Sequence, residues 1–432
     1  MLRFASSPTD DMRIGNLRVA IFNYIISKQK NEDLLVRIED IDKERNIEGK
    51  DKEILGLLDL FGIEYSQVIY QSQNFRFCSA MALQLLHEKK AFSCFCSAEH
   101  LKNKEEESKA NKVAYKYDGT CENLPAQLVI DNTNPFTIRI KKPQEKIIVK
   151  DYIKGEVSFE PNDVDSFIIM KQDKTPTHNF ACAVDDMLSD ISLVIQEEDY
   201  MSNASKQDHV RKFLKYEKNI EYAHLPIILN NNDKKISNKN DASSVKWLLE
   251  EGYLPSAISN YLILIGNKPP KEIFEINEAI EWFDLKNMSK SPALFDIDKL
   301  KFINRQHLKN MDEKELSRYV GFADAEIGKL AKIYLEETGT TKELRLKIKP
   351  IFEQKIIPQK FEEQTKIILQ VIKKAPHFKE YNDFIKYIIN ESGLKDKNLF
   401  KPLRIILTGA EHGPDLSEIY LCLKNYLGEI VK

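Results

Sequence analysis

The sequence predicts an α/β nucleotide-binding domain of Rossmann type, interrupted by an insertion and followed by all-helical domains. Two patterns predict this fold class. Apolar segments alternate between strand and helix spacing as far as residue 230, whereas from about residue 243 almost every periodic segment is helical. The length of 432 residues is also too great for one ordinary core and indicates several domains.

The first elements follow the order strand, helix, strand, helix. Residues 2–5 predict a short strand, a polar loop with Pro8 follows, and helical spacing begins at Gly15. The segment "DLLVRIED" (33–40) predicts a buried strand, and residues 47–63 predict an amphipathic helix. Ligands of such sheets bind beyond the carboxyl ends of the strands, so we expect a nucleotide near the first loop.

The segment from about 76 to 160 has a different character and predicts an insertion. Its charged run "LKNKEEESKANK" (101–112) is typical of a solvated helix, and "FTIRI" (136–140) of a short strand. Strand and helix patterns then resume with "SFIIM" (166–170), "ISLVIQ" (191–196) and "LPIIL" (225–229). We therefore expect the insertion to split the nucleotide-binding sheet.

The bulk composition excludes several protein classes. Charged residues make up 30% and hydrophobic residues 42% of the chain, a balance that predicts a folded protein. The N-terminus does not resemble a signal peptide, and no apolar run is long enough for a membrane span, so we expect a cytoplasmic protein. Because the net charge is −3, a nucleic-acid partner would need local basic patches.

Two loops are candidates for binding phosphate. In "FASSPTDDMRIGNLR" (4–18), Gly15 stands at a helix start, where free N–H groups attract anions. In "DKKISNKND" (233–241), lysines could neutralise phosphate charge. Both loops also have an explanation without phosphate. The loop at 4–18 could be an ordinary helix start, and the loop at 233–241 an ordinary solvated loop.

A cysteine cluster is a candidate zinc site. Cys94, Cys96 and Cys121 lie close in sequence to Tyr117, and such a set can supply four tetrahedral ligands. The alternative is a group of buried free cysteines, which behave as small apolar residues.

Taken in order, these segments resemble the bacterial glutamyl-tRNA synthetases, which are class I aminoacyl-tRNA synthetases. The similarity covers nearly the whole chain and includes "RFASSPTDDMRIGNLR", "LLVRIEDIDKERNIEG", "CFC" with "YDGTC", "KTPTHNFACAVDDML", "YAHLPIIL", "ASSVKWLLEEGYLPSAISNYL" and "PLRIILTGAEHGP". The resemblance implies a ligase of protein biosynthesis that uses ATP with Mg²⁺ to form glutamyl-adenylate and transfers glutamate to the 3′ end of tRNA(Glu) or tRNA(Gln).

The resemblance also implies a domain order. It places a Rossmann-type catalytic domain at 1–75 and 165–230, and an inserted connective domain that binds the acceptor end, with structural Zn²⁺, at 76–164. A loop and helical stem-contact region follows at 231–300, and a helical anticodon-binding domain at 301–432. We expect a monomer without membrane association.

The resemblance implies the following site residues. The catalytic set is Arg13, Gly15, Asn16, Lys235, Asn238 and Lys239. The ATP-binding set is Ser6, Ser7, Pro8, Thr9, Arg13, Ile14, Gly15, Asn16, Asp199, Ile228, Lys235, Ile236, Ser237, Asn238 and Lys239. The glutamate-binding set is Arg3, Ala5, Ser7, Glu39, His178, Cys182 and Gln196, in which Arg3 pairs with a substrate carboxylate and Glu39 with its ammonium group. The zinc ligands are Cys94, Cys96, Tyr117 and Cys121.

Several positions depart from the family pattern, and they gather in the ATP loops and the glutamate pocket. The residues that replace the usual ones are Ser6, Asp10, Arg13, His178, Gln196, Glu197, Tyr200 and Asn238. Two hypotheses follow. The chain is an active glutamate–tRNA ligase, or it is a catalytically impaired paralogue that binds tRNA.

Overall fold

The structure is a computed structural model that describes residues 1–113, 115–230 and 243–431. The chain forms two compact units. The first consists of Met1–Val245 with Leu262–Phe295, and the second of Lys246–Tyr261 with Asp296–Lys432. Among the described residues, no helix is long and apolar enough to cross a membrane.

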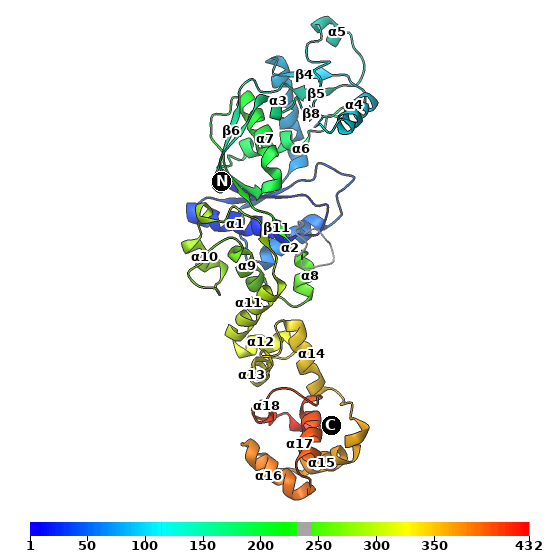
Figure 1. The fold of residues 1–432 in the computed structure, drawn as a ribbon, viewed down its shortest axis with the longest axis vertical. Coiled ribbons are helices and arrows are strands. Elements are labelled where there is room, and N and C mark those ends of the chain that lie inside the picture. Colours follow the sequence, from blue (N-terminus) through cyan, green and yellow to red (C-terminus); the bar gives the residue numbers. More distant parts are fainter. Residues whose placement is uncertain (114, 231–242, 432) are drawn as a thin grey trace. The chain divides into compact units, whose positions relative to one another are not determined.

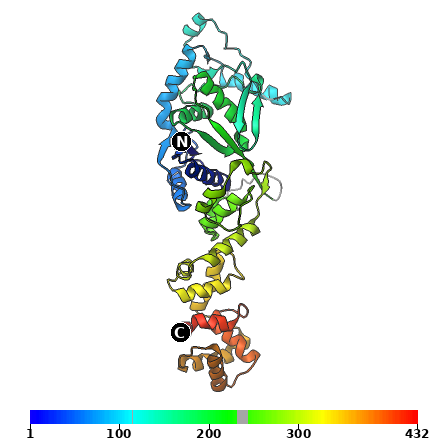
Figure 2. The same ribbon diagram turned by 90° about the vertical axis from the view of Figure 1, so that its left-hand side faces the viewer.

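The first unit is built on a seven-stranded sheet (Figures 1 and 2). In spatial order its strands are β3 (Gln67–Tyr70), β2 (Leu34–Ile38), β1 (Leu2–Ser6), β9 (Leu193–Glu197), β10 (Glu221–Leu225), β6 (Ile147–Asp151) and β7 (Gly155–Phe159). All neighbours pair in parallel except β7, which returns antiparallel to β6. The buried parallel strands are nearly continuous apolar runs, which explains their strand patterns in the sequence.

Helices position the functional loops around this sheet. The helix α1 (Ile14–Lys30) packs against β1 and β9 and ends at Asn31, whose left-handed backbone (φ 51°) closes the last turn. The other helices near the sheet are α2 (Lys50–Leu60), α6 (His178–Leu188) and α7 (Met201–Phe213), with the short 3₁₀ turns η1 (Gln71–Asn74), η2 (Pro161–Asp163) and η3 (Glu198–Tyr200). The helix predicted at 47–63 is present as α2, which is shorter than predicted at both ends.

A smaller antiparallel sheet forms the core of the inserted region. It contains β4 (Ala91–Cys94), β5 (Thr137–Ile140) and β8 (Ile168–Met170), accompanied by α3 (Phe75–His87), α4 (Ala98–Ala110) and α5 (Ala126–Ile130). No residue of α4 is buried, which confirms that its charged run forms a solvated helix.

The boundary between the sheets differs from the expected domain division. The strands β6 and β7 lie in the segment assigned to the insertion, yet they join the large sheet through β10 (Figure 2). Conversely, β8 lies in the segment assigned to the catalytic domain and pairs with β5. The strand β6 is buried at every second residue, which fits a strand with one solvated face equally well in the large sheet and in a separate small sheet.

The segment "LPIIL" is not one strand. The strand β10 ends at Leu225, Pro226 interrupts the run because it has no N–H to donate, and β11 (Ile228–Leu229) pairs with β12 (Ala293–Leu294). This two-stranded ribbon belongs to the first unit, whose remaining helices are α10 (Ile276–Trp282) and the 3₁₀ turn η4 (Leu285–Asn287).

In the part of the chain that the structure describes, the second unit consists of helices. They are α8 (Val245–Glu250) and α9 (Pro255–Leu264), each shared at one end with the first unit, and then α11 (Ile297–Asn310), α12 (Glu313–Tyr319), α13 (Ala325–Tyr334), α14 (Thr341–Phe352), η5 (Gln359–Phe361), α15 (Glu362–Lys374), α16 (Tyr381–Ser392), α17 (Lys397–Thr408), α18 (Leu416–Leu423) and α19 (Leu427–Ile430). Among the helices of this unit, α12 and α13 make the most extensive contact with each other. The predicted helical second half is present.

Candidate active site

A cavity of about 480 Å³ opens at the carboxyl ends of β1 and β9. It brings together most of the residues that the sequence assigns to ATP and glutamate, namely Arg3, Ala5, Ser6, Ser7, Thr9, Arg13, Ile14, Gly15, Asn16, Glu39, His178, Cys182, Gln196 and Ile228. Pro8 and Asp199 are not part of its lining. Lys235, Ile236, Ser237, Asn238 and Lys239 lie outside the described residues.

The cavity has one end at the start of α1. Arg13 precedes the helix in an extended conformation, and its side chain does not cap the helix. Instead Arg13 Nη2 lies 3.1 Å from Asp10 Oδ2, so the guanidinium offsets the unusual acidic residue beside it. The backbone of Ser243 accepts a hydrogen bond from Ile14 (3.0 Å), and Val245 donates to Met12 (3.1 Å). The chain that follows the second candidate loop thus lies directly against the first.

A carboxylate lies against the first turn of α1. A Cβ atom placed on Gly15 would be 2.0 Å from Glu197 Oε1, so only glycine leaves room for this side chain in its present position. Glu197 is the last residue of β9 and occupies one of the positions that depart from the family pattern. The departure at position 197 is visible in the sequence, but only the fold shows that the Glu197 side chain lies at the start of α1.

The other end of the cavity holds three functional side chains in mutual contact. Glu39 Oε2 lies 3.2 Å from His178 Nε2, the Cys182 thiol donates to Glu39 Oε1 at 3.3 Å, and Cys182 Sγ lies 3.5 Å from His178 Nε2. His178 and Cys182 are one helical turn apart on α6, so both face the end of β2, where Glu39 follows. Burial disfavours the Glu39 carboxylate, but the hydrogen bond and charge of His178 hold its pKa well below the usual range.

Beneath these residues lies a buried ion network. Asp186 Oδ1 accepts from Arg37 Nη1 at 2.5 Å and from Arg3 Nε at 3.2 Å, and Arg37 Nη2 also donates to Glu39 Oε1 at 3.1 Å. Arg37 and Asp186 are almost completely buried. Burial alone would raise the pKa of Asp186, but the two arginines hold it below the usual value.

Sequence reasoning missed Arg37 and Asp186, although a signal was present. An arginine in the apolar run "LLVRI" and an acidic pair within "ACAVDDML" are costly to bury unless each finds a partner. The network links Arg3 to Glu39 through a chain of contacts, because Arg3 bonds Asp186, Asp186 bonds Arg37, and Arg37 bonds Glu39.

A second buried pair supports Gln196. Gln196 Nε2 lies 2.8 Å from His224 Nε2, and His224 Nδ1 lies 2.6 Å from Asp151 Oδ2. The side chains of His224 and Asp151 are fully buried. Since Asp151 accepts from Nδ1, the Nε2 atom of a neutral His224 is free to accept from the Gln196 amide. This arrangement turns the Gln196 side-chain nitrogen toward β10.

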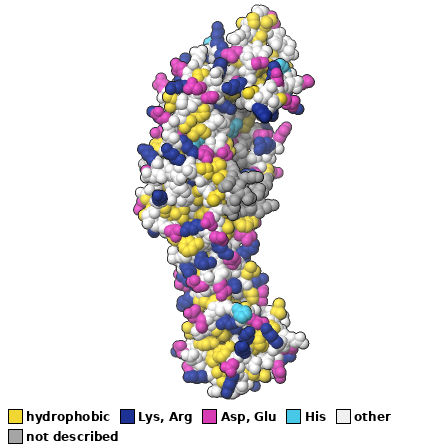
Figure 3. Space-filling view, in the orientation of Figure 1, with side chains coloured by type: hydrophobic (Ala, Val, Ile, Leu, Met, Phe, Trp, Pro, Cys, Tyr) yellow, Lys and Arg dark blue, Asp and Glu magenta, His cyan; other side chains and the backbone are white. Residues whose placement is uncertain are grey.

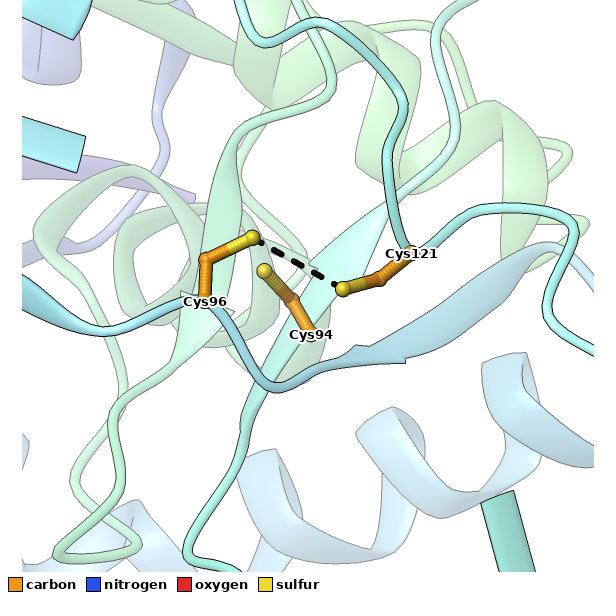
Figure 4. A group of neighbouring side chains, drawn as sticks. All are labelled: Cys94, Cys96 and Cys121. Atoms are coloured by element: carbon orange, nitrogen blue, oxygen red, sulfur yellow. Dashed lines mark hydrogen bonds between the residues drawn. The ribbon is translucent and has the colours of Figure 1, made fainter. Parts of the chain in front are cut away.

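Three of the four predicted zinc ligands, the cysteines, converge in the inserted region (Figure 4). The sulfur atoms of Cys94, Cys96 and Cys121 lie within 4.8 Å of one another. Tyr117 Oη lies 3.5 Å from the sulfurs of Cys94 and Cys96 and accepts from the Cys121 backbone N–H at 3.0 Å. Cys94, Tyr117 and Cys121 are buried and form a small core with Phe92.

Comparisons with known proteins match the whole chain. The sequence signature described as "tRNA synthetases class I (E and Q), catalytic domain" matches residues 1–302, and an "Anticodon binding domain" signature matches residues 307–424. The chain is 70% identical to glutamate–tRNA ligase 2 of Sulfurimonas denitrificans and 56% identical to glutamate–tRNA ligase 1 of Nitratiruptor sp., in both cases over 432 residues and 100% of each protein.

A solved structure supports the same conclusion. The crystal structure of glutamate-tRNA synthetase from Elizabethkingia anophelis superposes with a TM-score of 0.82 and 25% identity, covering 100% of this chain and 98% of that one. Because the signatures, the relatives and the fold agree from end to end, this chain belongs to the glutamate–tRNA ligases of the class I aminoacyl-tRNA synthetases.

Proposed function

We propose that this protein activates glutamate with ATP in the cavity at the carboxyl ends of β1 and β9, and transfers the product to the 3′ end of tRNA(Glu) or tRNA(Gln). One observation carries the assignment of residues to these steps. A single cavity joins a helix start suited to phosphate with an Arg3, Glu39 and His178 end suited to an amino acid. We further propose that it acts in the cytoplasm as a monomer.

The chemistry needs positioning more than a reactive side chain. A carboxylate oxygen of glutamate attacks the α-phosphorus of ATP, and pyrophosphate leaves with the bonding electrons. The ribose hydroxyl of the tRNA then attacks the adenylate carbonyl and releases AMP. Both steps depend on alignment of the reacting atoms and on stabilisation of charge that develops on phosphate oxygens.

Each end of the cavity supplies part of this alignment. Arg3, held by Asp186 through its Nε atom, presents positive charge to a substrate carboxylate, and Glu39 presents negative charge to the ammonium group. At the other end, the N–H groups of Gly15 and Asn16 lie in the first turn of α1, where no intrahelical acceptor is available to them. Mg²⁺ would neutralise phosphate charge when it enters with ATP.

The altered loop residues do not identify an inactive protein. The relatives that match every residue of this chain are ligases by name, so the comparisons do not support the hypothesis of a catalytically impaired paralogue. The ion pair between Arg13 and Asp10 also supports an active loop, because it removes the extra negative charge that Asp10 would otherwise bring to the phosphates.

The side-chain geometry of the inserted region favours a structural zinc site. In a tetrahedral zinc site with bonds of about 2.3 Å, neighbouring ligand atoms are about 3.7 Å apart. The separations of 3.5 to 3.7 Å among Cys96, Cys121 and Tyr117 fit this geometry. We propose that Cys94, Cys96, Cys121 and Tyr117 hold zinc, which would cross-link the strand end at β4 to the turn around Tyr117.

Glutamate-dependent exchange of pyrophosphate into ATP tests the proposed function. We expect exchange with glutamate, measured both without tRNA and with purified tRNA(Glu) and tRNA(Gln), followed by attachment of labelled glutamate to one or both tRNAs. The Glu39→Gln variant should raise KM for glutamate about tenfold or more, because a charge-assisted bond to ammonium is lost. KM for ATP should change little.

The control is Glu64→Gln, which changes an exposed acidic residue that pairs with Lys28. It should leave both KM values unchanged. Absence of exchange with either tRNA and with total tRNA would overturn the proposed function.

Metal analysis tests the zinc site separately. Protein made in zinc-replete medium should contain about one more zinc per chain than the Cys96→Ser variant, because the variant loses one of four ligands. The matched Cys422→Ala change removes a buried thiol in α18 and should retain the metal. A zinc content that is equal in wild type and Cys96→Ser would exclude the site.

A further inference from the structure

We propose that Glu39, His178 and Cys182 form a second zinc site inside the active-site cavity, and that zinc and glutamate exclude each other there. The inference rests on the proposed function in one respect, the assignment of this end of the cavity to glutamate. The metal site itself rests on the geometry of the three side chains.

The three side chains place one ligand atom each within 4.8 Å of one another, and their direct contacts are close to the spacings of a tetrahedral site. Bonds of about 2.0 to 2.3 Å from zinc to nitrogen, oxygen and sulfur place neighbouring ligand atoms about 3.3 to 3.8 Å apart. The observed separations are 3.2 Å from Glu39 Oε2 to His178 Nε2, 3.3 Å from Cys182 Sγ to Glu39 Oε1, and 3.5 Å from Cys182 Sγ to His178 Nε2, so each oxygen of the Glu39 carboxylate contacts one of the other two ligands. A metal ion can therefore replace these hydrogen bonds without a large movement of any side chain.

The backbone fixes the ligands from two directions. His178 and Cys182 lie four residues apart on α6, which places both side chains on one face of the helix. Glu39 follows β2 and meets them from the sheet. Three ligands that are already assembled leave the fourth tetrahedral position to the cavity, as in zinc sites that bind an exchangeable molecule.

Neighbouring residues orient these ligands. Arg37 Nη2 donates to Glu39 Oε1 at 3.1 Å, and the Gln71 side-chain amide lies 3.7 Å from Cys182 Sγ. Outer contacts of this kind hold metal ligands in position. The ion network below the site holds two arginines against Asp186, and Arg37 also pairs with Glu39, so a divalent ion needs the negative charge of the Cys182 thiolate in addition to that of the Glu39 carboxylate.

The donor set selects the metal. One thiolate, one imidazole and one carboxylate suit zinc, whereas Mg²⁺ and Ca²⁺ prefer oxygen ligands alone. Binding would release the Cys182 thiol proton to solvent, because the thiolate is the ligand form. The 2% exposure of Cys182 and the half-exposed His178 place the ion at the cavity wall, where solvent reaches it only from the substrate side.

Glutamate and zinc compete because they need the same oxygens. The proposed function assigns the Glu39 carboxylate to the substrate ammonium group, and an ammonium group and a zinc ion are both positive. With zinc on this carboxylate, the positive ammonium group would lie beside a divalent cation and be repelled by it, so each ligand weakens the binding of the other. Free zinc would consequently reduce glutamate activation by acting on the amino-acid end of the cavity.

Zinc titration of the full-length protein tests the metal site. Protein that retains its tightly bound zinc is titrated with Zn²⁺ by calorimetry and with Co²⁺ by absorption, which reports thiolate coordination. We expect one additional equivalent with wild type and with the Cys422→Ala control. Cys182→Ala should weaken this additional binding about tenfold or more, since it removes a ligand. His178→Tyr should also weaken it about tenfold or more, since a phenol must lose a proton with a pKa of about 10 before it binds zinc, whereas a neutral imidazole binds directly.

Both substitutions should leave the protein folded, so that weaker zinc binding is not explained by misfolding. Alanine favours the helix α6, and tyrosine is the residue that the family pattern expects at 178. Both variants should retain the zinc of the cysteine cluster. Additional binding that is equal in wild type, Cys182→Ala and His178→Tyr, or that is absent from wild type, would overturn the metal site.

Competition is measured by repeating the titration with glutamate. At a glutamate concentration of about ten times its Kd, the apparent Kd of the additional zinc should rise about tenfold. An unchanged zinc Kd would overturn mutual exclusion. Pyrophosphate exchange with Mg²⁺ but without added zinc is a separate readout, so failure of the proposed function would be recognised even if zinc binds through Cys182 and His178.

Discussion

At the scale of single residues, the contact between Gly15 and Glu197 has the clearest consequence for ATP. The Glu197 carboxylate lies at the first turn of α1, the end of the helix that attracts anions. A negative side chain at this place opposes an incoming phosphate group. The departure from the family pattern at position 197 should therefore weaken ATP binding without preventing it.

We predict that Glu197→Gly lowers KM for ATP severalfold, by roughly 0.5 to 1 kcal/mol of binding free energy per removed like charge near a helix terminus. Steady-state aminoacylation kinetics measure the change, and KM for glutamate should stay the same. Glu64→Gln serves as the control for loss of a distant exposed charge. A higher KM for ATP in Glu197→Gly would contradict the prediction and would indicate that the carboxylate assists nucleotide binding.

A second residue-scale prediction concerns pH. His209 on α7 is buried, its Nε2 atom lies 2.7 Å from the Lys141 carbonyl oxygen, and among the described residues its Nδ1 atom has no hydrogen-bond partner. Burial lowers the pKa of His209 from 6.5 to about 4. At pH values between 4 and 6.5, His209 therefore binds a proton in the unfolded chain but not in the folded chain. The stability of the fold consequently falls as the pH decreases from about 6.5 to 4.

The loss should be about 3 kcal/mol at most, and His209→Gln should reduce this part of the pH dependence because it removes the titrating ring. Urea unfolding at a series of pH values measures the effect. His87→Gln replaces an exposed histidine at the end of α3 and should leave the wild-type profile unchanged. Parallel pH profiles for wild type and His209→Gln would exclude the proposed cause.

At the scale of elements, the pair α12 and α13 depends on one glycine. A Cβ atom on Gly328 would lie 1.8 Å from the carbonyl oxygen of Glu313 and 2.7 Å from its Cα atom. Backbone atoms cannot move aside as a flexible side chain can. The two helices therefore require glycine where they cross.

We predict that Gly328→Ala destabilises the second unit by about 2 kcal/mol or more, despite the better helix propensity of alanine, because the helices must separate. The matched control is Gly428→Ala in α19, where an added Cβ would meet no atom within 4 Å. That change should be neutral or slightly stabilising. Equal unfolding temperatures for the two variants would contradict this account of the crossing.

Sequence patterns predicted the helices and strands more reliably than they predicted which strands pair with each other. The helix that begins near Gly15 follows from its apolar spacing, and the charged helix α4 from its lack of an apolar face. The membership of β6 and β7 in the large sheet did not follow, because a period of two marks a half-buried strand but does not identify its neighbour.

The site shows the same limit. The resemblance located Glu39, His178 and Cys182, and the structure places them in contact. Neither Asp186 nor His224 was expected, because their roles arise from pairing across the fold with Arg37 and Asp151. Buried charges within apolar runs signal that a partner exists but do not say which residue it is.

At the scale of the whole molecule, the two compact units should unfold separately. Each has its own buried core, and a chain with two cores does not generally unfold in one cooperative transition. We predict two calorimetric transitions. Glutamate with ATP should raise only the transition of the unit that contains the cavity, by about 2.7 kcal/mol at a hundred times Kd.

The Gly328→Ala variant assigns the transitions, because it should lower only the one that the ligands leave unchanged. A single transition that responds to both the ligands and the variant would show that the units are coupled and would contradict this prediction.

The charge of the molecule predicts how tRNA is bound. The net charge of −3 gives no general attraction for a polyanion, and Figure 3 shows Lys and Arg side chains interspersed with Asp and Glu over the visible face. Recognition must therefore use local groups of basic residues. Which of them contact tRNA did not follow from the sequence, because a surface ion pair and a phosphate contact use the same residue types.

The position of β1 in the sheet has a consequence for synthesis of the protein. This strand is made before the other strands of the sheet, yet in the sheet it lies between β2 and β9, and β9 is made about 190 residues later. At about 5 to 20 residues per second, one edge of β1 waits roughly 10 to 40 s for its neighbour. During that time β1 and β2 present an apolar, unpaired edge, which makes the nascent chain a substrate for chaperones until β9 and β10 emerge.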